Sequence, residues 1–176
     1  MTDEALTYLG RKVDAANIDL KAARAEPHLA MTGARPEPVR KNIERLWRQG
    51  TWVEVTTLVV PGWNDSDEDL RAIAEFLASV DPDLPWHVSR FHPDYQERDR
   101  PATPAATLGR AYDLGRAAGL RHVYPGNLPG DDREHTLCPG CGATLIERHG
   151  FRMGRVRLAQ GACLACGRKL AGVGIP

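Results

Sequence analysis

The sequence predicts an α/β protein, a partial (β/α) barrel of about four βα units followed by a small zinc-ribbon domain. Up to about residue 128, segments with a strand pattern alternate with segments that have the periodicity of amphipathic helices. The predicted strands carry polar side chains on one face, whereas an open doubly wound sheet would be apolar on both faces. All four cysteines follow residue 137 in two C-x2-C pairs, which indicates a separate metal-binding unit.

The first part of the predicted barrel contains two helices and two strands. A short helix is expected between Thr2, as N-cap, and Gly10, because acidic residues fill its first turn. A strand over residues 13–20 follows it. The apolar residues of 38–50 recur at helical spacing before a glycine, which predicts an amphipathic helix. The β-branched run at 52–60 predicts the second strand.

The second part repeats this order. A helix is expected to begin at Ser66, where a serine and an acidic residue three positions later form a capping-box pattern. Residues 86–92 predict the third strand. Thr103, which a proline follows, is expected to cap a helix that ends at Gly119. A short fourth strand is expected at 121–124. This alternation is typical of a parallel sheet built from βαβ units.

Polar residues gather on one face of the predicted strands, towards the carboxyl ends. A (β/α) barrel has its active site at that end of its strands. Eight βα units need about 250 residues, and fewer than 130 are available before the Gly- and Asp-containing stretch that begins at residue 126. We therefore expect half a barrel over residues 1–128, a linker over 129–137 and a zinc ribbon over 138–176. The polar positions are Asn17, Asp19 and Lys21, then Glu54 and Thr56, then Arg90 and His92.

Asp19 and Lys21 stand two positions apart, on the same face of the first predicted strand. They could form no more than an ion pair in the barrel interior. They could equally hold a zwitterionic ligand, with the carboxylate meeting hydroxyls or an ammonium and the lysine meeting a carboxylate. His92, at the end of the third strand, could reach the same ligand, although a lone histidine in such a place is usually structural.

The two C-x2-C pairs predict a closed structural zinc site. Each pair can form a tight turn, because the glycine that follows it permits a left-handed backbone conformation. Short strands around glycine turns are expected between the pairs. Four thiolates in a tetrahedron suit Zn²⁺ and leave no open position for catalysis. Iron in a rubredoxin-like site is less favoured, as are disulfides or free thiols. The predicted ligands are Cys138, Cys141, Cys163 and Cys166.

The composition says little about partners. There are 23 basic and 23 acidic residues, so no overall attraction to nucleic acid or to an anionic membrane is expected. No apolar run approaches the ~20 residues that span a bilayer, and the acidic N-terminus is unlike a secretory signal. Both features favour the cytoplasm. The ribbon has six basic residues against Glu147, which we interpret as a solvated basic face rather than a nucleic-acid footprint.

Several segments, taken in order, resemble a known family. The runs VDAANIDLK, VEVTTLVVPGWND, WHVSRFHPDY, RHVYPGN, CPGCG and CLACG closely resemble the C-terminal part of the radical SAM protein of the AmmeMemoRadiSam system, a relative of the pyruvate formate-lyase activating enzymes. The resemblance implies that Asp19, Lys21 and His92 contact S-adenosylmethionine and that the loop at 60–65 lines the ligand pocket. It also implies a [4Fe–4S] cluster, at which S-adenosylmethionine is reductively cleaved to a deoxyadenosyl radical that abstracts hydrogen.

The sequence departs from this family at the cluster. The family's C-x3-C-x2-C loop is absent, and so is its glycine-rich methionine-binding segment. We therefore expect the C-terminal portion of a radical SAM enzyme of the glycyl-radical-activating type, inactive alone because roughly the first three to four βα units are missing. Its hydrogen donor, a protein or a small molecule, is not identified.

The alternative is a non-catalytic module whose zinc ribbon contacts a protein or nucleic acid. In either case the predicted strand at 13–20 would lie at an open edge of the barrel. Its unpaired backbone groups are expected to cause dimerisation or aggregation.

Overall fold

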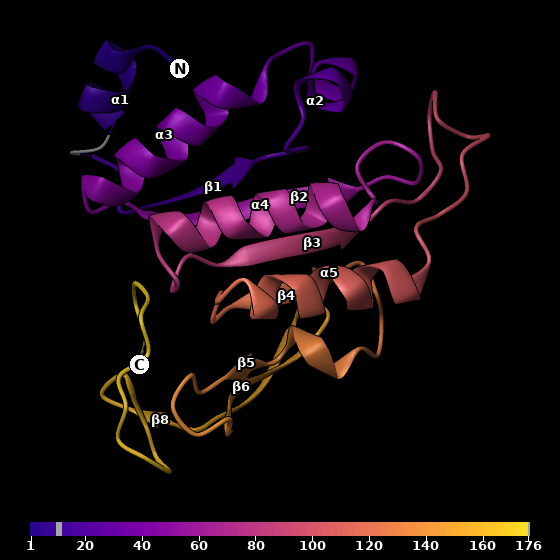
Figure 1. Ribbon diagram of the computed structural model, residues 1–176. Coiled ribbons are helices and arrows are strands. Elements are labelled where there is room, and N and C mark those ends of the chain that lie inside the picture. Colours follow the sequence, from indigo (N-terminus) through magenta and orange to yellow (C-terminus); the bar gives the residue numbers. More distant parts are fainter. Residues whose placement is uncertain (10–11, 176) are drawn as a thin grey trace.

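The computed structural model describes residues 1–9 and 12–175, and consists of a larger α/β part followed by a smaller β part (Figure 1). The predicted helix stop at Gly10 lies outside the described residues. None of the helices in the described part of the chain combines the length and the apolar character that crossing a bilayer requires. The elements of the α/β part are α1 (Asp3–Leu9), β1 (Ala15–Asp19), α2 (Ala25–Thr32), α3 (Pro36–Arg48), β2 (Trp52–Val59), α4 (Asp67–Val80), β3 (Trp86–Arg90), α5 (Ala105–Ala117) and β4 (Val123–Gly126).

The four strands of the α/β part form one parallel sheet in the order β1-β2-β3-β4. Each strand pairs with the next one along the chain, so the helices between them are crossover connections. The register aligns Asp19, Thr56, His87 and Tyr124 in one row across the sheet. Because side chains alternate along a strand, these four residues lie on the same face.

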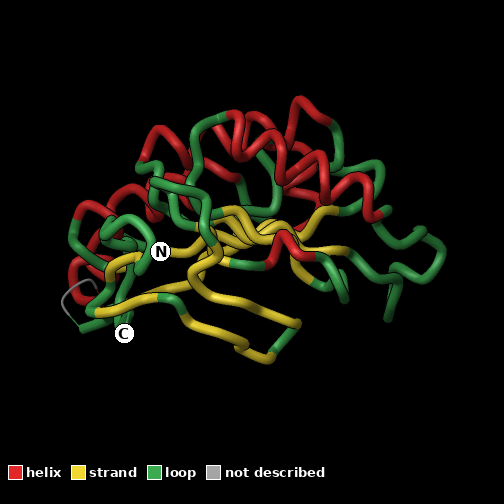
Figure 2. The backbone as a smooth tube through the Cα atoms, turned by 90° about the horizontal axis from the view of Figure 1, so that it is seen from below, coloured by secondary structure: helices red, strands yellow, loops and turns green. Residues whose placement is uncertain are grey.

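Helices cover only the other face of this sheet, as Figure 2 shows. The strand residues on the covered face are buried against the apolar stripes of α3, α4 and α5. Each buried aliphatic or aromatic side chain stabilises the fold by about 1.5–3 kcal/mol. The core comprises Val53, Val55, Val59, Trp86 and Val88 from the strands and Ile43, Leu46, Leu70, Ile73, Leu77, Leu108 and Ala111 from the helices. The uncovered face is the one that would line the interior of a barrel.

The three predicted helix caps have different outcomes. Thr2 precedes α1 as expected, and its hydroxyl accepts the backbone N–H of Ala5 over 3.3 Å. Ser66 caps α4 as expected, and its hydroxyl accepts the backbone N–H of Asp69 at 3.1 Å. The predicted cap at Thr103 is wrong, because α5 begins two residues later. Thr103 is buried between the ends of β2 and β3, where its hydroxyl donates to the carbonyl of Val59 and accepts from the backbone N–H of Phe91. Unpaired backbone groups are costlier at these buried strand ends than at an exposed helix terminus.

The β part contains a three-stranded antiparallel sheet, β5-β6-β7, and a two-stranded sheet, β8-β9. Gly150, with a left-handed φ of 62°, makes the predicted glycine turn between β6 and β7. Leu145, Ile146 and Leu170 form a small core with two of the cysteines. The elements are the 3-10 helix η1 (Asp132–Glu134), β5 (Thr136–Leu137), β6 (Thr144–His149), β7 (Arg152–Val156), β8 (Leu158–Ala159) and β9 (Ala162–Cys163).

The β6–β7 hairpin extends below the uncovered face of the parallel sheet (Figure 2). A hydrogen bond of 3.0 Å between the hydroxyls of Tyr124 and Thr136 joins the two sheets. Residues 129–137, the predicted linker, contain η1 and β5, and η1 contacts β4. How the chain divides into domains stays a prediction.

Two further details differ from the sequence-based expectations. The helix α2 was not expected, because its apolar residues do not follow a helical stripe and Pro27 lies in its first turn. β1 and β3 are each shorter than the apolar runs that predicted them, 15–19 against 13–20 and 86–90 against 86–92. β3 is two residues shorter at its carboxyl end, whereas β1 is two residues shorter at its amino end and one residue shorter at its carboxyl end.

Candidate ligand site and metal centre

The uncovered face of the parallel sheet carries a row of polar side chains. Asn17 and Asp19 of β1 are exposed, while Thr56 of β2 and His87 of β3 are half-buried. The Thr56 hydroxyl donates to the amide oxygen of Asn17 over 3.1 Å. Arg90 does not belong to this row, because it shares the strand parity of residues that face the helices. The polar face predicted from β1 and β2 is therefore real, but β3 contributes His87 in place of Arg90.

Asp19 and Lys21 form an ion pair just at the carboxyl end of β1. The Lys21 Nζ lies 3.1 Å from Oδ1 of Asp19, and the two side chains are 23% and 56% exposed, respectively. The buried residues beside them, Leu20 and Ala22, have the opposite parity. Both charged groups thus lie away from the helix layer, where a ligand could reach them. Their contact with S-adenosylmethionine stays a prediction.

Buried polar side chains hold the segment that carries Lys21. The Asn64 amide donates to the carbonyls of Lys21 and Leu58, and its oxygen accepts the backbone N–H of Val60 at 2.6 Å. The hydroxyl of Thr57 donates to the carbonyl of Leu20 at 2.8 Å. Asn64 belongs to the loop at 60–65, which was expected to line the ligand pocket. Its side chain is instead buried and fixes the neighbouring backbone.

His92 lies two residues beyond the end of β3 and is exposed. It stands at the same edge of the sheet as Asp19 and Lys21, because the carboxyl ends of parallel strands meet there. β2 separates it from them, a distance of about two strand spacings or roughly 10 Å. No contact joins His92 to either residue among the described side chains. Its share in a common ligand site stays a prediction.

The four cysteine sulfurs converge on one point in the β part, within 4.8 Å of one another. The Sγ atoms of Cys138 and Cys166 are 3.6 Å apart, and those of Cys141 and Cys163 are 3.8 Å apart. Four Zn–S bonds of about 2.3 Å in a tetrahedron place the sulfurs roughly 3.8 Å apart. Disulfides require about 2.0 Å. The quartet therefore fits a metal ion of the size of zinc.

Two matching turns aim these sulfurs inward. Gly142 and Gly167 have left-handed φ values of 74° and 75°, as predicted. Their backbone N–H groups donate to the carbonyls of Cys138 and Cys163 over 2.9 and 2.8 Å, respectively. The same turn closes each pair, so the two halves of the site are built alike.

The protonation of these thiols also favours a bound cation. Burial opposes ionisation of Cys138, but hydrogen bonds from the backbone of Cys141 and Gly140 outweigh it and lower the pKa of Cys138 to about 6. A backbone hydrogen bond from Arg168 favours the Cys166 thiolate, yet the surrounding cysteines raise the pKa of Cys166 to about 12. The raised pKa of Cys166 shows that these neighbouring sulfurs disfavour a further negative charge, which a bound cation would offset.

No family model matches the chain, but three curated proteins do. It is 43% identical over 161 residues to an uncharacterised protein of Methanocaldococcus jannaschii. The matched region is 90% of this chain and 48% of that protein. It is 40% identical over 65 residues to the benzylsuccinate synthase activating enzyme of Thauera aromatica, covering 37% and 20%. It is 34% identical over 74 residues to the isethionate sulfite-lyase activating enzyme of Oleidesulfovibrio alaskensis, covering 39% and 24%. Over less than two fifths of its length, the chain is homologous to these two activating enzymes. It spans less than half the length of each of these three relatives.

Solved structures confirm the predicted fold of this activating-enzyme homologue. A domain of the pyruvate-formate lyase-activating enzyme from Bacteroides vulgatus matches with a TM-score of 0.62 and 19% identity, over 72% of this chain and 75% of that one. A radical SAM methyltransferase from Sphaerobacter thermophilus matches with a TM-score of 0.56 and 18% identity, over 70% and 38%. The four-stranded parallel sheet with its helices therefore has the fold of the matched part of these two proteins, as the prediction of a partial barrel requires.

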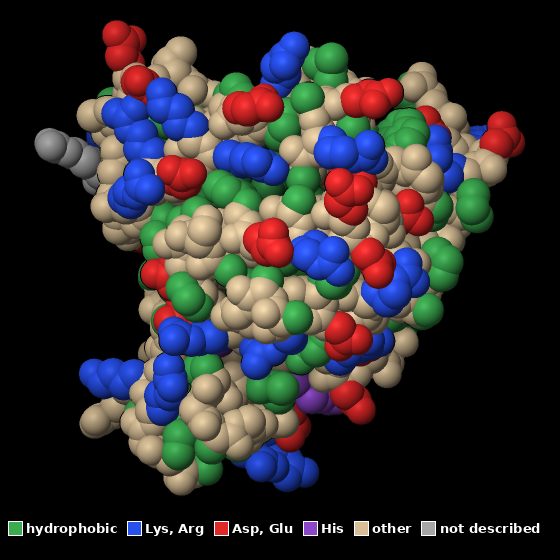
Figure 3. All heavy atoms as spheres, in the orientation of Figure 1, with side chains coloured by type: hydrophobic (Ala, Val, Ile, Leu, Met, Phe, Trp, Pro, Cys, Tyr) green, Lys and Arg blue, Asp and Glu red, His purple; other side chains and the backbone are tan. Residues whose placement is uncertain are grey.

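Charge is distributed differently over the two parts of this homologue. Acidic and basic side chains are interspersed over the helix-covered face (Figure 3). In the β part, five of the six basic residues are exposed, as a solvated basic face predicts. Arg148 is half-buried and lies against the parallel sheet. Neither Arg148 nor His87 was expected at a site. For His87, the signal was its position in the run WHVSR, between Trp86 and Val88, the two apolar residues that face the helices.

Proposed function

We propose that this chain is the C-terminal portion of a radical SAM enzyme of the glycyl-radical-activating type and binds S-adenosylmethionine at the carboxyl ends of β1 and β3. The observation that carries the proposal is the Asp19–Lys21 ion pair at the carboxyl end of β1, on the open face of a partial radical SAM barrel. In the family that the sequence resembles, an Asp-x-Lys pair on a barrel strand contacts this ligand. Homology to two activating enzymes supports the same function.

The side chains at this edge suit a zwitterionic nucleoside. The Lys21 ammonium pairs with the carboxylate of the methionine moiety, and the Asp19 carboxylate accepts hydrogen bonds from ribose hydroxyls or the ligand's ammonium. Without ligand, Asp19 and Lys21 pair with one another over 3.1 Å. When the ligand binds, each of them pairs with a group of the ligand instead. His92, in the loop after β3, contacts the nucleoside.

The cluster of this enzyme class, when bound, supplies the electron for reductive cleavage of S-adenosylmethionine. The four cysteines of this chain converge in the ribbon, so we assign the cluster ligands to the remainder of a longer protein. The archaeal relative is about twice as long as the matched region, which supports this assignment. The part of the present chain is to bind and orient the ligand and to exclude water from it.

The names of two relatives denote enzymes that activate another enzyme. This favours a protein over a small molecule as the hydrogen donor of the present protein. We also place it in the cytoplasm, because a reducing compartment keeps thiols available for metal binding.

Calorimetric titration of the 176-residue chain with S-adenosylmethionine tests the ligand site. We expect weak, saturable binding, because half of the barrel pocket and the cluster are missing. Lys21→Gln is expected to weaken it about tenfold, the loss of one charge-assisted hydrogen bond. Lys41→Gln, at an exposed lysine of α3 that pairs with Asp3, serves as the matched control and is expected to bind as the wild type does.

Equal binding by Lys21→Gln and the wild type would refute the ligand role of the ion pair. Tight binding by the isolated chain would refute the view that the pocket is incomplete. The DNA upstream of the Met1 codon tests the parent activity separately. An in-frame extension that encodes C-x3-C-x2-C supports the enzyme, whereas an in-frame stop codon close by supports a non-catalytic module.

A further inference from the structure

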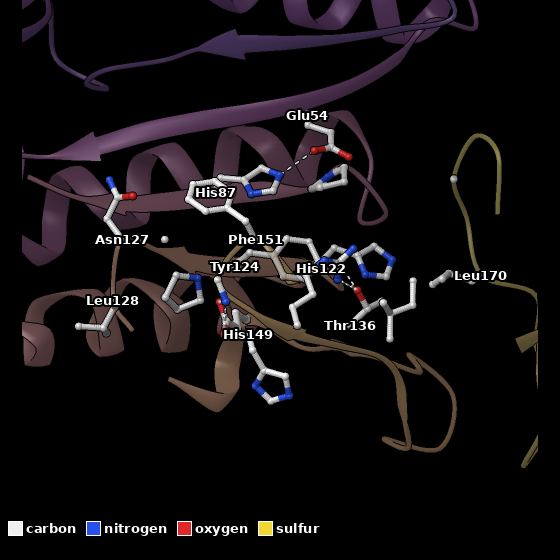
Figure 4. A pocket seen from close by; sticks show the side chains of 18 of the residues that line it. Glu54, His87, His122, Tyr124, Asn127, Leu128, Thr136, His149, Phe151 and Leu170 are labelled. Atoms are coloured by element: carbon white, nitrogen blue, oxygen red, sulfur yellow. Dashed lines mark hydrogen bonds and ion pairs between the residues drawn. The ribbon is translucent and has the colours of Figure 1, made fainter. Parts of the chain in front are cut away.

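A cavity of about 1000 Å³ lies between the uncovered face of the parallel sheet and the β6–β7 hairpin. This volume is at the upper end of what small-molecule pockets occupy, about 300–1,000 Å³. Figure 4 shows Glu54 and His87 of the sheet on one side and Thr136, His149 and Phe151 of the β part around the same space. The cavity extends from the amino-terminal ends of β2 and β3 along β4 to the residues that follow it. Asp19, Lys21 and His92, the residues of the S-adenosylmethionine site proposed above, do not line it.

A carboxylate–imidazole pair forms one wall of this cavity. Oε2 of Glu54 lies 2.7 Å from Nε2 of His87, and the indole N–H of Trp52 donates to Oε1 of Glu54 over 3.2 Å. The hydrogen bond with His87 lowers the pKa of Glu54, against the opposing effect of burial. Glu54 is therefore ionised at neutral pH and orients the ring by its Nε2. The Nδ1 of His87 has no hydrogen-bond partner among the described residues and remains available to a ligand.

A guanidinium held at two points forms the opposite wall. Arg148, on β6, donates to the hydroxyl of Thr136 and stacks over the ring of Tyr124, with 5.3 Å from Cζ to the ring centroid. The ring of His87, on β3, is 5.3 Å from the ring of Tyr124, on the neighbouring strand β4. His87 and Arg148 therefore both border the ring of Tyr124. Only Nη1 of Arg148 is engaged among the described residues. Its other donors suit a planar anion.

We propose that this cavity binds a small organic molecule that carries a carboxylate, with Arg148 pairing the carboxylate and His87 bonding to a hydroxyl or amino group at the ligand's other end. The aromatic residues Trp52 and Tyr124 favour a flat body between these two groups. The site takes residues from both sheets, so the cysteine-bearing part of the chain contributes a binding residue to the barrel. The proposal does not rest on the function proposed above, because it uses none of the same residues.

Titration with 4-hydroxybenzoate, benzoate and inorganic phosphate tests this site in the 176-residue chain by calorimetry. 4-Hydroxybenzoate has a carboxylate, a ring and a hydroxyl in line, and is expected to bind more tightly than benzoate. Arg148→Gln is expected to weaken the binding of 4-hydroxybenzoate and of benzoate at least about tenfold. Arg148→Lys is expected to weaken their binding less. His87→Gln is expected to weaken the binding of 4-hydroxybenzoate several-fold and to leave the binding of benzoate unchanged. The matched control is Arg155→Gln on the same hairpin, at an exposed arginine outside the cavity.

Zinc content and circular dichroism, measured on each variant, separate loss of binding from loss of folding. Absence of saturable binding to the wild type, or equal binding by Arg148→Gln, would overturn the proposal. Phosphate binding more tightly than either carboxylate would overturn the assignment of ligand class. S-adenosylmethionine binding that survives in Arg148→Gln while 4-hydroxybenzoate binding is lost would support two independent sites.

Discussion

Buried polar side chains fix the segments that border the open face of the sheet. Thr57, Asn64, Asp69 and Thr103 are each at most 1% exposed, and each is hydrogen-bonded to groups far away in the sequence. A buried polar group costs free energy unless it is paired, so such bonds specify one arrangement of the chain. They hold the loop that carries Lys21 and the ends of β2 and β3.

Asp69 gives this arrangement a pH dependence. Its carboxylate accepts hydrogen bonds from Nε and Nη2 of Arg24, at 2.6 and 2.8 Å, and from the hydroxyl of Ser66, at 2.8 Å. Burial opposes its ionisation, but the hydrogen bonds from Arg24 and Ser66 outweigh it and lower the pKa of Asp69. A lowered folded-state pKa stabilises the fold above the unfolded-state value of about 3.9, and this contribution is lost as pH falls through the folded-state value.

We therefore expect Asp69→Asn to lower the free energy of unfolding by about 2 kcal/mol at pH 7, less than for a fully buried pair because Arg24 is half exposed. Urea unfolding from pH 7 to pH 3 measures this. The difference from the wild type should stay constant down to about pH 5 and shrink below about pH 4. Asp67→Asn, in the same helical turn but with an exposed ion pair to Arg110, is the control and should cost less than about 1 kcal/mol. A difference that does not change with pH would contradict the role of the charge.

The strands and turns of the β part have little core to stabilise them. Leu145, Ile146 and Leu170 are its buried apolar residues besides the cysteines, and all five residues of β7 are exposed. So small a core cannot by itself offset the conformational entropy of ordering the segment. We expect metal binding by the cysteines to supply the missing free energy, since it would tie together four ligands from two turns.

Purified protein is expected to contain about one zinc per chain, with four sulfurs at about 2.3 Å by X-ray absorption. Cys166→Ser, or treatment with a chelator, is expected to unfold the β part while the parallel sheet keeps its protection in hydrogen exchange. Ala165→Ser, in the same turn, is the control and should retain the metal. A protein without zinc, or one with iron in its place, would contradict the assignment.

The molecule as a whole has an open β-sheet edge. β1 pairs only with β2 among the described residues. The carbonyl of Asp14 and the N–H of Leu20 bond to β2, so the alternation of a parallel ladder directs the backbone groups of Ala15, Asn17 and Asp19 to the open side. Such an edge is a template for another chain.

We expect the 176-residue chain to dimerise or aggregate through this edge, measured by size exclusion with light scattering. Ala15→Pro removes one open-edge N–H without removing a bond to β2, and is expected to increase the monomer fraction. Ala105→Pro, at the first position of α5 where proline is tolerated, is the matched control. A stable wild-type monomer with slow amide exchange in β1 would mean that the edge is covered in another way.

Features whose cause is local were predictable. The capping box at Ser66, the glycine turns after each cysteine pair and the apolar runs of the strands each depend on residues within a few positions of one another. For the same reason the order of strands and helices, and with it the partial barrel, could be inferred. The convergence of the four cysteines was predictable because two short turns determine where their sulfurs point.

Features that depend on distant residues were decided by the tertiary structure. Thr103 has the local pattern of a helix cap, but the ends of β2 and β3 bind its hydroxyl instead. Glu54 and His87 are 33 positions apart, and only the register of β2 against β3 brings them to 2.7 Å. In the sequence, Arg148 is only one of six basic residues of the predicted ribbon. The packing of the β6–β7 hairpin places it over the ring of Tyr124. The sequence by itself determined the elements other than α2 and the four cysteines of the candidate metal site, because neighbouring residues encode them. The tertiary structure decided the cavity between the two sheets, because its walls meet only when separate elements pack.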